Sequence, residues 1–103
     1  MASKYKNVKT EIDGITFDSI KEAKRYQELK LLVRAGIIKV LVLQKPFPIV
    51  VNGVKICTYK CDFSYYGQDG RETVEDVKGV RTAVFSIKAK LMIAVYGLRV
   101  LET

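Results

Sequence analysis

The sequence places charged side chains inside two stretches that otherwise alternate like β-strands. Asp62 lies within YKCDFSYY, and Asp76 and Lys78 lie within VEDVKG. Alternate residues of a strand share a face, so Asp76 and Lys78 should point the same way, while Glu75 points to the other face and should form a cross-strand ion pair. A carboxylate in a covered strand costs several kcal/mol unless it is paired or bound to a metal.

This arrangement of side chains suits metal-dependent hydrolysis of a phosphodiester. Two neighbouring carboxylates repel each other, and a hard divalent cation turns both into favourable ligands. Mg²⁺, for which Mn²⁺ can substitute, takes one or two carboxylates, keeps waters and accepts a phosphate oxygen. We expect Asp62 and Asp76 to bind the metal and Lys78 to serve the attacking water or the transition-state charge. The structural alternatives are two surface carboxylates on edge strands and a plain Asp76–Lys78 salt bridge.

A helix is predicted before these strands, in DSIKEAKRYQELKLLVRAG (18–36). Ser19 can cap its start, and Gly36 stands where a left-handed terminal residue belongs. Ser19-x-x-Glu22 is a capping box, so Glu22 is either a helix cap or a third acidic member of the site. The apolar stripe that should face the core consists of Ile20, Ala23, Tyr26, Leu29 and Val33.

The remaining segments predict one α/β domain over residues 1–103, with a mixed β-sheet flanked by helices. The basic start, residues 1–9, is expected to be a mobile arm. A second helix is predicted over 81–96 and ends at Gly97; because strands precede and follow it, a right-handed crossover should join parallel neighbours. Strands or hairpin arms are predicted at EIDGITF (11–17), IIKVLVLQ (37–44), FPIVV (47–51), a long strand VKICTYKCDFSYY (54–66), RETVEDVKG (71–79) and LRVLE (98–102), with Lys45-Pro46-Phe47-Pro48 as an interruption.

The amino-acid composition favours one class of partner and excludes one class of enzyme. Eighteen Lys and Arg against eleven Asp and Glu give a net charge of +7 and a pI near 9.5, which favours a polyanionic partner. The chain has no histidine, so catalytic triads that use an imidazole base are excluded. Cys57 and Cys61 are expected to be reduced core thiols. No long apolar run or secretory signal is present, so a cytoplasmic protein is expected.

The spacing of the acidic residues and the lysine, D(x13)DxK, resembles the PD-(D/E)xK nuclease superfamily. The fuller match runs through FDSIKEAKRYQELKLL, LVLQKPF, YKCDFSYY, VEDVKG and TAVFSIKAKL, and looks like a small family of phage and prophage proteins. The resemblance implies a restriction-endonuclease-like fold and a site made of Glu22, Asp62, Asp76 and Lys78. Cys61 replaces the proline of the motif, and Asp76 replaces its more usual glutamate.

The expected function is therefore a Mg²⁺-dependent DNA endonuclease. Gln44, Lys60 and Lys88 are the candidate DNA contacts. So small a domain has little surface for reading a base sequence, which favours branched DNA such as a Holliday junction. Cutting both strands or a symmetric junction would require a homodimer. Two alternatives stay open: a non-catalytic nucleic-acid-binding module on the same fold, and a small phage-type assembly protein with an acidic partner.

Overall fold

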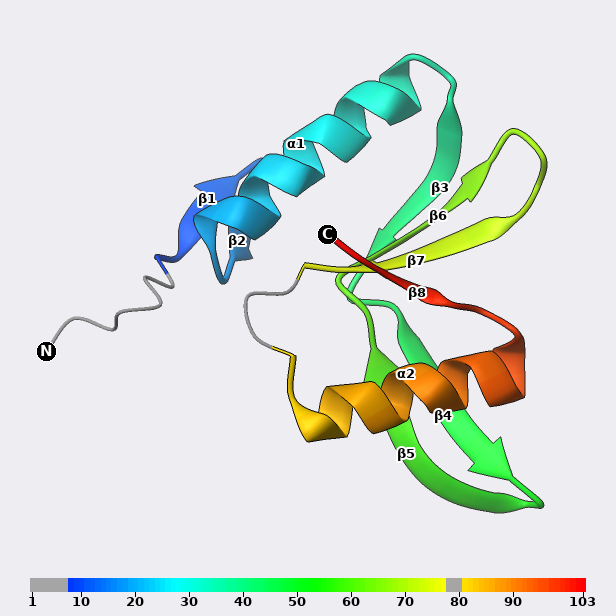
Figure 1. The fold of residues 1–103 in the computed structure, drawn as a ribbon. Helices are drawn as coiled ribbons and strands as arrows, with labels where there is room; N and C mark the ends of the chain where they lie inside the picture. Colours follow the sequence, from blue (N-terminus) through cyan, green and yellow to red (C-terminus); the bar gives the residue numbers. More distant parts are fainter. Residues whose placement is uncertain (1–7, 78–80) are drawn as a thin grey trace, which may run out of the picture.

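The computed structural model describes residues 8–77 and 81–103 (Figure 1). Most of the predicted arm, residues 1–7, lies outside the described part. In the described part, no helix is long and apolar enough to cross a membrane. The elements are β1 (Thr10–Ile12), β2 (Ile15–Phe17), α1 (Ile20–Arg34), β3 (Ile38–Leu43), β4 (Pro46–Val51), β5 (Val54–Lys60), β6 (Phe63–Gly67), β7 (Glu72–Asp76), α2 (Ala83–Tyr96) and β8 (Val100–Glu102).

The centre of the fold is a mixed sheet with the strand order β3-β6-β7-β8. β6 pairs with β3 and β7 antiparallel, whereas β7 and β8 are parallel and are joined through α2. β1–β2 and β4–β5 form two separate hairpins. The predicted α/β class is therefore confirmed, as is the parallel pairing across the second helix. β7, which carries Asp76, is an inner strand of this sheet, as predicted.

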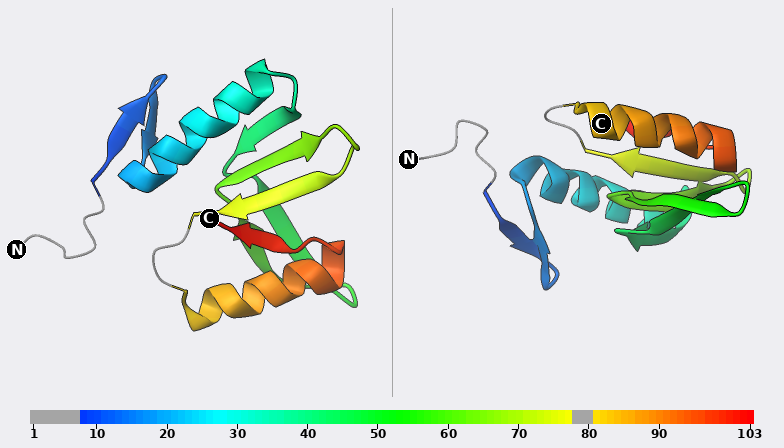
Figure 2. Two further views of the ribbon diagram at one scale, coloured as in Figure 1. Left: turned by 45° about the horizontal axis from the view of Figure 1, so that its top comes forward. Right: turned by 90° about the horizontal axis from the view of Figure 1, so that it is seen from below.

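The two faces of the sheet are covered by different elements (Figure 2). On one face, Tyr26 and Leu29 of α1 pack in a cluster with Phe63 of β6. On the other face, Met92 of α2 packs with Val74 of β7, and the β4–β5 hairpin joins the same cluster. Successive residues of β7 thus point into different cores, which fixes the direction of every side chain near its end.

Helix α1 begins and ends where the capping signals predicted. Its N-cap Ser19 accepts a hydrogen bond from the backbone N–H of Glu22 at 3.1 Å, and Gly36 has a φ of 77°. The predicted core stripe is only partly correct, because Ile20 and Val33 are 48% and 36% exposed. A spacing of three residues drifts by about 60° around a helix at each step, so Ile20 rotates off the buried face. Val33 lies in the last turn.

The predicted long strand over 54–66 is wrong. β5 ends at Lys60 and β6 begins at Phe63, with a break at Cys61 and Asp62. The segment that pairs with this break is interrupted at the same position. There the N–H of Gln44 donates to the carbonyl of Asp62 at 3.1 Å, and Gln44 has a φ of 55°. A left-handed residue bends a strand, so the ribbon turns here and the two halves enter different sheets.

The predicted interruption at residues 45–48 is only partly correct, because Lys45 lies between β3 and β4, whereas strand β4 begins at Pro46 and includes both prolines. Proline lacks an N–H and fits a strand where that position faces away from the ladder. The carbonyl of Pro48 accepts a hydrogen bond from the hydroxyl of Tyr96 at 2.5 Å, outside the β4–β5 pairing. The prolines therefore lie in β4 without costing it a ladder bond.

Candidate active site

The structure brings Asp62 and Asp76 together. Asp76 is the last residue of β7 and is 5% exposed, and Asp62 occupies the break between β5 and β6. Their side chains share a hydrogen bond. Asp62 also accepts a bond from the backbone N–H of Val77 at 2.8 Å and one from the Gln44 side-chain amide at 3.3 Å. A carboxylate from the end of β7 and a carboxylate from the break between β5 and β6 are thus held side by side.

The proximity of the two carboxylates changes the acidity of Asp62. Burial, the hydrogen bond with Asp76 and the negative charges of Asp76 and Glu22 raise the pKa of Asp62 to about 7, and the Val77 N–H opposes this rise only in part. Asp62 therefore holds a proton to a higher pH than an ordinary aspartate does. A raised carboxyl pKa contributes stability below about pH 4, and this contribution is lost as the pH rises through about 7.

Substituting Asp62→Asn should stabilise the protein when no divalent metal is present. We expect the free energy of unfolding to rise by about 1–2 kcal/mol near pH 8, since water screens part of the repulsion of this half-buried carboxylate. The difference should disappear below about pH 4, where Asp62 is protonated in both the folded and the unfolded states. Urea unfolding in EDTA at the two pH values measures it. A variant that is less stable than the parent protein near pH 8 would contradict this account of the pair.

Tyr59 is a member of the site that the sequence did not single out. Tyr59 is a buried residue of β5, and its hydroxyl donates to Oδ2 of Asp76 at 2.6 Å. Burial and the carboxylate raise the pKa of Tyr59 far above its ordinary value, so the hydroxyl keeps its proton. Because an aromatic residue in a strand is most often a packing residue, its residue type alone did not mark it as a member of the site. Its hydroxyl fixes one oxygen of Asp76, Oδ2.

Removing this hydroxyl with Tyr59→Phe should loosen Asp76 without removing a charge. We expect the metal concentration needed for half-maximal binding to rise by about 10-fold, as is typical when a group that orients a metal ligand is lost. Isothermal titration with Mn²⁺ measures the change. Tyr66→Phe is a matched control, because Tyr66 is half-buried on the neighbouring strand. Equal Mn²⁺ affinities for the Tyr59→Phe variant and the parent protein would contradict the positioning role.

Glu22 was predicted to be either part of the helix cap or a third acidic member of the site, and the structure is compatible with both roles. Its backbone N–H is capped by Ser19, and its half-buried carboxyl lies near Asp76. Burial raises the pKa of Glu22, and the charges of Asp18 and Asp76 raise it further. The negative charges of Glu22 and of the acidic pair therefore act on each other. Over the described ranges, 8–77 and 81–103, no three or more His, Cys, Asp or Glu side chains form a group that could hold a metal ion.

A cavity of about 320 Å³ opens on the α2 side of the pair. Lys88 reaches across it and donates to the carbonyl of Thr58 at 3.3 Å. Two of the three predicted DNA contacts, Lys60 and Lys88, therefore lie in the same cavity as the carboxylates, and the third, Gln44, binds Asp62 directly. Lys78 lies outside the described residues. The cavity is lined by Thr58, Tyr59, Lys60, Asp62, Asp76, Val84, Phe85 and Lys88.

Glu75 points away from the cavity, as predicted, but the predicted cross-strand ion pair is wrong, because its charged partner is Arg25 of α1 and not a residue of a neighbouring strand. Arg25 of α1 binds it with two nitrogens, at 2.8 and 2.6 Å, and the hydroxyl of Tyr65 donates to it as well. Burial alone would raise the pKa of Glu75, but the Arg25 and Tyr65 bonds bring it below its ordinary value. This ion pair ties α1, which carries Glu22, to β7, which carries Asp76.

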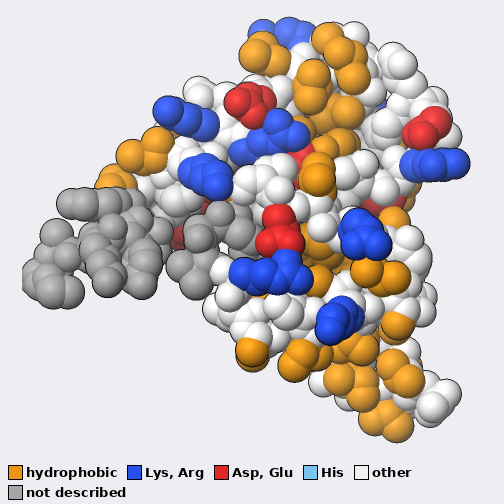
Figure 3. Space-filling model, in the orientation of Figure 1, with side chains coloured by type: hydrophobic (Ala, Val, Ile, Leu, Met, Phe, Trp, Pro, Cys, Tyr) orange, Lys and Arg blue, Asp and Glu red, His pale blue; other side chains and the backbone are white. Residues whose placement is uncertain are grey.

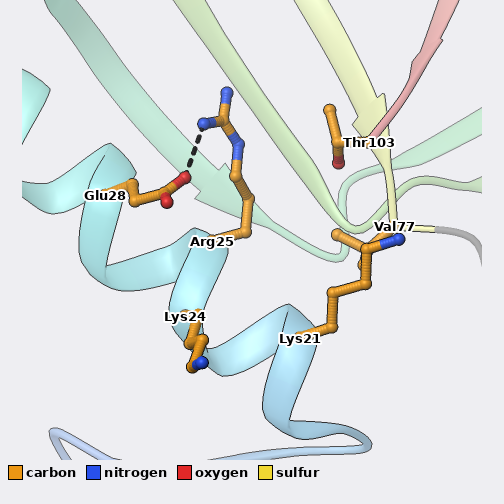
Figure 4. Close-up of a pocket in the computed structure, with 6 residues that line it drawn as sticks. All are labelled: Lys21, Lys24, Arg25, Glu28, Val77 and Thr103. Carbon is orange, nitrogen blue, oxygen red and sulfur yellow. Dashed lines mark hydrogen bonds and ion pairs between the residues drawn. The ribbon is translucent and has the colours of Figure 1, made fainter.

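A second cavity, of about 270 Å³, lies on the α1 side of the end of β7 (Figure 4). Lys21 and Lys24 project from α1 at its rim, and Val77 forms its far wall. Val77 follows Asp76 directly, so the two cavities open one residue apart on opposite faces of the sheet. The lining consists of Lys21, Lys24, Arg25, Glu28, Val77 and Thr103.

Comparison with known proteins gives a family but no activity. No curated protein and no solved structure matches the chain. A family model described as "Protein of unknown function (DUF1064)" matches residues 2–100. Since this match spans nearly all of the 103 residues, the chain belongs to the DUF1064 family.

Proposed function

We propose that the protein is a Mg²⁺-dependent DNA endonuclease of the PD-(D/E)xK type. The observation that carries the proposal is the pair of hydrogen-bonded carboxylates, Asp62 and Asp76, beside a cavity that two lysines line. A protein gains little stability from holding two carboxylates against each other, so a functional cause is the better explanation. The resemblance of the sequence to this superfamily supports the same conclusion.

The donor groups of the site fit magnesium. Asp62 and Asp76 would supply two hard carboxylate ligands, which is the number that Mg²⁺ commonly takes from a protein, and Glu22 would assist directly or through a water. When bound, the ion neutralises phosphate charge and makes a water more acidic. Tyr59 holds Asp76 in place, and the Val77 N–H holds Asp62. We assign the nucleophile-serving role to Lys78 from its place in the DxK spacing.

The DNA surface in this proposal spans both cavities. Lys60 and Lys88 stand on the α2 side of β7, and Lys21 and Lys24 stand on the α1 side. Figure 3 shows Lys and Arg side chains spread over the side of the molecule that Figure 1 views. Because these contacts are to phosphates, they position DNA without reading its sequence. We therefore propose branched DNA, such as a four-way junction, as the substrate, and the cytoplasm of a bacterial host cell as the place of action for a phage or prophage product.

The direct test is a cleavage assay on supercoiled plasmid and on a synthetic four-way junction. Each substrate is incubated with Mg²⁺, Mn²⁺, Ca²⁺ or EDTA. We expect cleavage with the first two ions and none with EDTA, and faster cleavage of the junction than of a linear duplex of the same arm sequence. Intact DNA with both Mg²⁺ and Mn²⁺ would overturn the enzymatic proposal.

One observation favours the non-catalytic nucleic-acid-binding module instead. The described residues contain no trio of acidic, cysteine or histidine side chains that could enclose a metal by themselves. This alternative predicts DNA binding of the same strength with and without divalent ions, and no cleavage. The assay above therefore separates the two functions.

The α1 cavity yields a prediction about DNA affinity. Lys24→Ala should weaken binding to every DNA sequence alike and reduce the slope of log affinity against log salt concentration by about 0.9, the value for one released counterion. Fluorescence anisotropy in EDTA measures binding without cleavage. Lys30→Ala is the matched control, because Lys30 lies farther along α1 over the ring of Tyr26. Equal slopes for the two variants would show that the α1 cavity does not contact DNA.

A further inference from the structure

The α1 cavity has the size of a site for one small planar group. Its volume of about 270 Å³ is close to the lower end of the range for small-molecule sites, which is about 300–1,000 Å³. A double helix cannot enter a cavity of this size, whereas a single nucleobase can. The proposed DNA surface uses only the lysines at the rim of this cavity, so its interior has no role in that proposal.

The lining of the α1 cavity combines apolar walls with a basic rim. Val77 contributes an isopropyl group to the far wall, and Lys21 and Lys24 are exposed at the rim (Figure 4). A lysine side chain has an apolar stem and a charged end, so its stem can contact an apolar group while its ammonium group meets an anion. A nucleotide has the complementary distribution, because its base has apolar faces and its phosphate is an anion.

Arg25 gives the cavity a flat surface that is held in place. Its Nε and Nη2 donate to Glu75 at 2.8 and 2.6 Å, and its Nη1 donates to Glu28 at 2.9 Å. Two carboxylates thus balance its charge and fix its plane, so a phosphate gains little from binding it. A base can still stack on the flat side of a guanidinium group, because stacking leaves these hydrogen bonds intact. The Arg25 side chain is 25% exposed and lines the cavity.

The α1 cavity lies directly beside the acidic pair. Val77 follows Asp76 in the chain, and the cavities that these two residues line open on opposite faces of the sheet. One residue of a β-strand spans about 3.3 Å, which is close to the rise of about 3.4 Å between successive nucleotides along a DNA helix. A DNA strand that places a phosphate at the acidic pair can therefore place the base of a neighbouring nucleotide in the α1 cavity.

We infer that the α1 cavity binds the base of one unpaired nucleotide, stacked on Arg25 and packed against Val77. The inference rests on the proposed function and narrows its substrate class to DNA with an unpaired nucleotide beside the phosphate that is cut. A paired base would first have to leave its duplex, and this costs least for a base that is already unpaired. The cavity thus selects branched or bulged DNA by a base that it accepts, without reading which base it is.

Fluorescence anisotropy in EDTA with three DNA duplexes tests the inference. The first duplex is fully paired, the second carries one additional unpaired thymidine, and the third carries an abasic sugar and phosphate in place of that thymidine. The second and third have the same number of phosphates, so a difference between them reports the base alone. We expect the parent protein to bind the thymidine duplex at least about 5-fold more tightly than the abasic duplex, as is typical for the stacking of one base.

Val77→Phe fills the cavity and should remove this preference. Val33→Phe is the matched control, because it makes the same change in the last turn of α1, outside the lining of the cavity, and it should keep the preference. Lys24→Ala should weaken the binding of all three duplexes alike, since it removes a phosphate contact and not a base contact. Circular dichroism confirms that each variant is folded.

Two results would overturn the inference while leaving the proposed function intact. One is equal binding of the thymidine and abasic duplexes by the parent protein, a comparison that needs no variant. The other is a preference for thymidine that survives in folded Val77→Phe, which would place the base elsewhere. A parent protein that binds none of the three duplexes would overturn both the inference and the DNA function. Since EDTA prevents cleavage in this assay, an inactive enzyme would leave the base site unaffected.

Discussion

We expect Asp76→Asn to reduce the rate of the proposed DNA cleavage by about three orders of magnitude and to leave DNA binding unchanged or tighter. Asparagine keeps the shape of the side chain and can still accept the hydrogen bond from Tyr59, so the fold is retained. It removes the negative charge that a divalent cation requires, and losses of this size follow when a group that acts on the transition state is removed. The same change removes repulsion between the site and the phosphates of DNA.

Single-turnover cleavage with Mg²⁺ and anisotropy with Ca²⁺ measure the two halves of this prediction. Asp69→Asn is the matched control, because Asp69 lies in the exposed turn between β6 and β7 and makes the same change of charge. The control should cut at the rate of the parent protein. Cleavage by Asp76→Asn at the parental rate would show that the catalytic centre lies elsewhere.

Arg25→Met lowers the free energy of unfolding by about 3–5 kcal/mol near neutral pH. The substitution leaves the carboxylate of Glu75 buried with no cation, and breaking a buried ion pair from one side typically has this cost. The pKa of Glu75 lies below its ordinary value in the parent protein, so its contribution to stability is present above about pH 4.5 and is lost as the pH falls. In the variant, acid protonates Glu75, so the difference between the two proteins should shrink.

Urea unfolding followed by circular dichroism at neutral and acid pH measures this loss. Arg34→Met is its control, because Arg34 is exposed in the last turn of α1. A loss for Arg25→Met no larger than that of the control, about 0.5 kcal/mol or less for a surface change, would show that the ion pair does not hold α1 to the sheet.

Several elements could be predicted from the sequence because neighbouring residues specify them. Ser19 and Gly36 mark the ends of α1, and Asp13-Gly14 supplies the two left-handed residues of the β1–β2 turn. Gly97, with a φ of 70°, ends α2 where expected. The alternation of β7 correctly separated Asp76 from Glu75, because side-chain direction in a strand depends on parity alone.

The features that could not be predicted depend on residues far apart in the chain. Arg25 and Glu75 are fifty positions apart, and no spacing rule joins a helix residue to a strand residue. Tyr59 of β5 donates to Asp76 of β7, next to the bend at Gln44. Gln44 has a left-handed backbone, which its residue type does not indicate. The position of Asp62 in a break, and not inside a long strand, follows from the same bend. Local propensity specifies the elements, and packing decides where they bend and which side chains meet.

The central claim is that the carboxylates of Asp62 and Asp76 together bind a divalent cation. Anomalous X-ray scattering from crystals soaked in Mn²⁺ tests it most directly, because the signal locates manganese without reference to activity. The account predicts one strong peak within bonding distance of a carboxylate oxygen from each residue, and no peak there in crystals of Asp76→Asn. Manganese bound only elsewhere, with Asp62 and Asp76 still sharing their hydrogen bond, would contradict it.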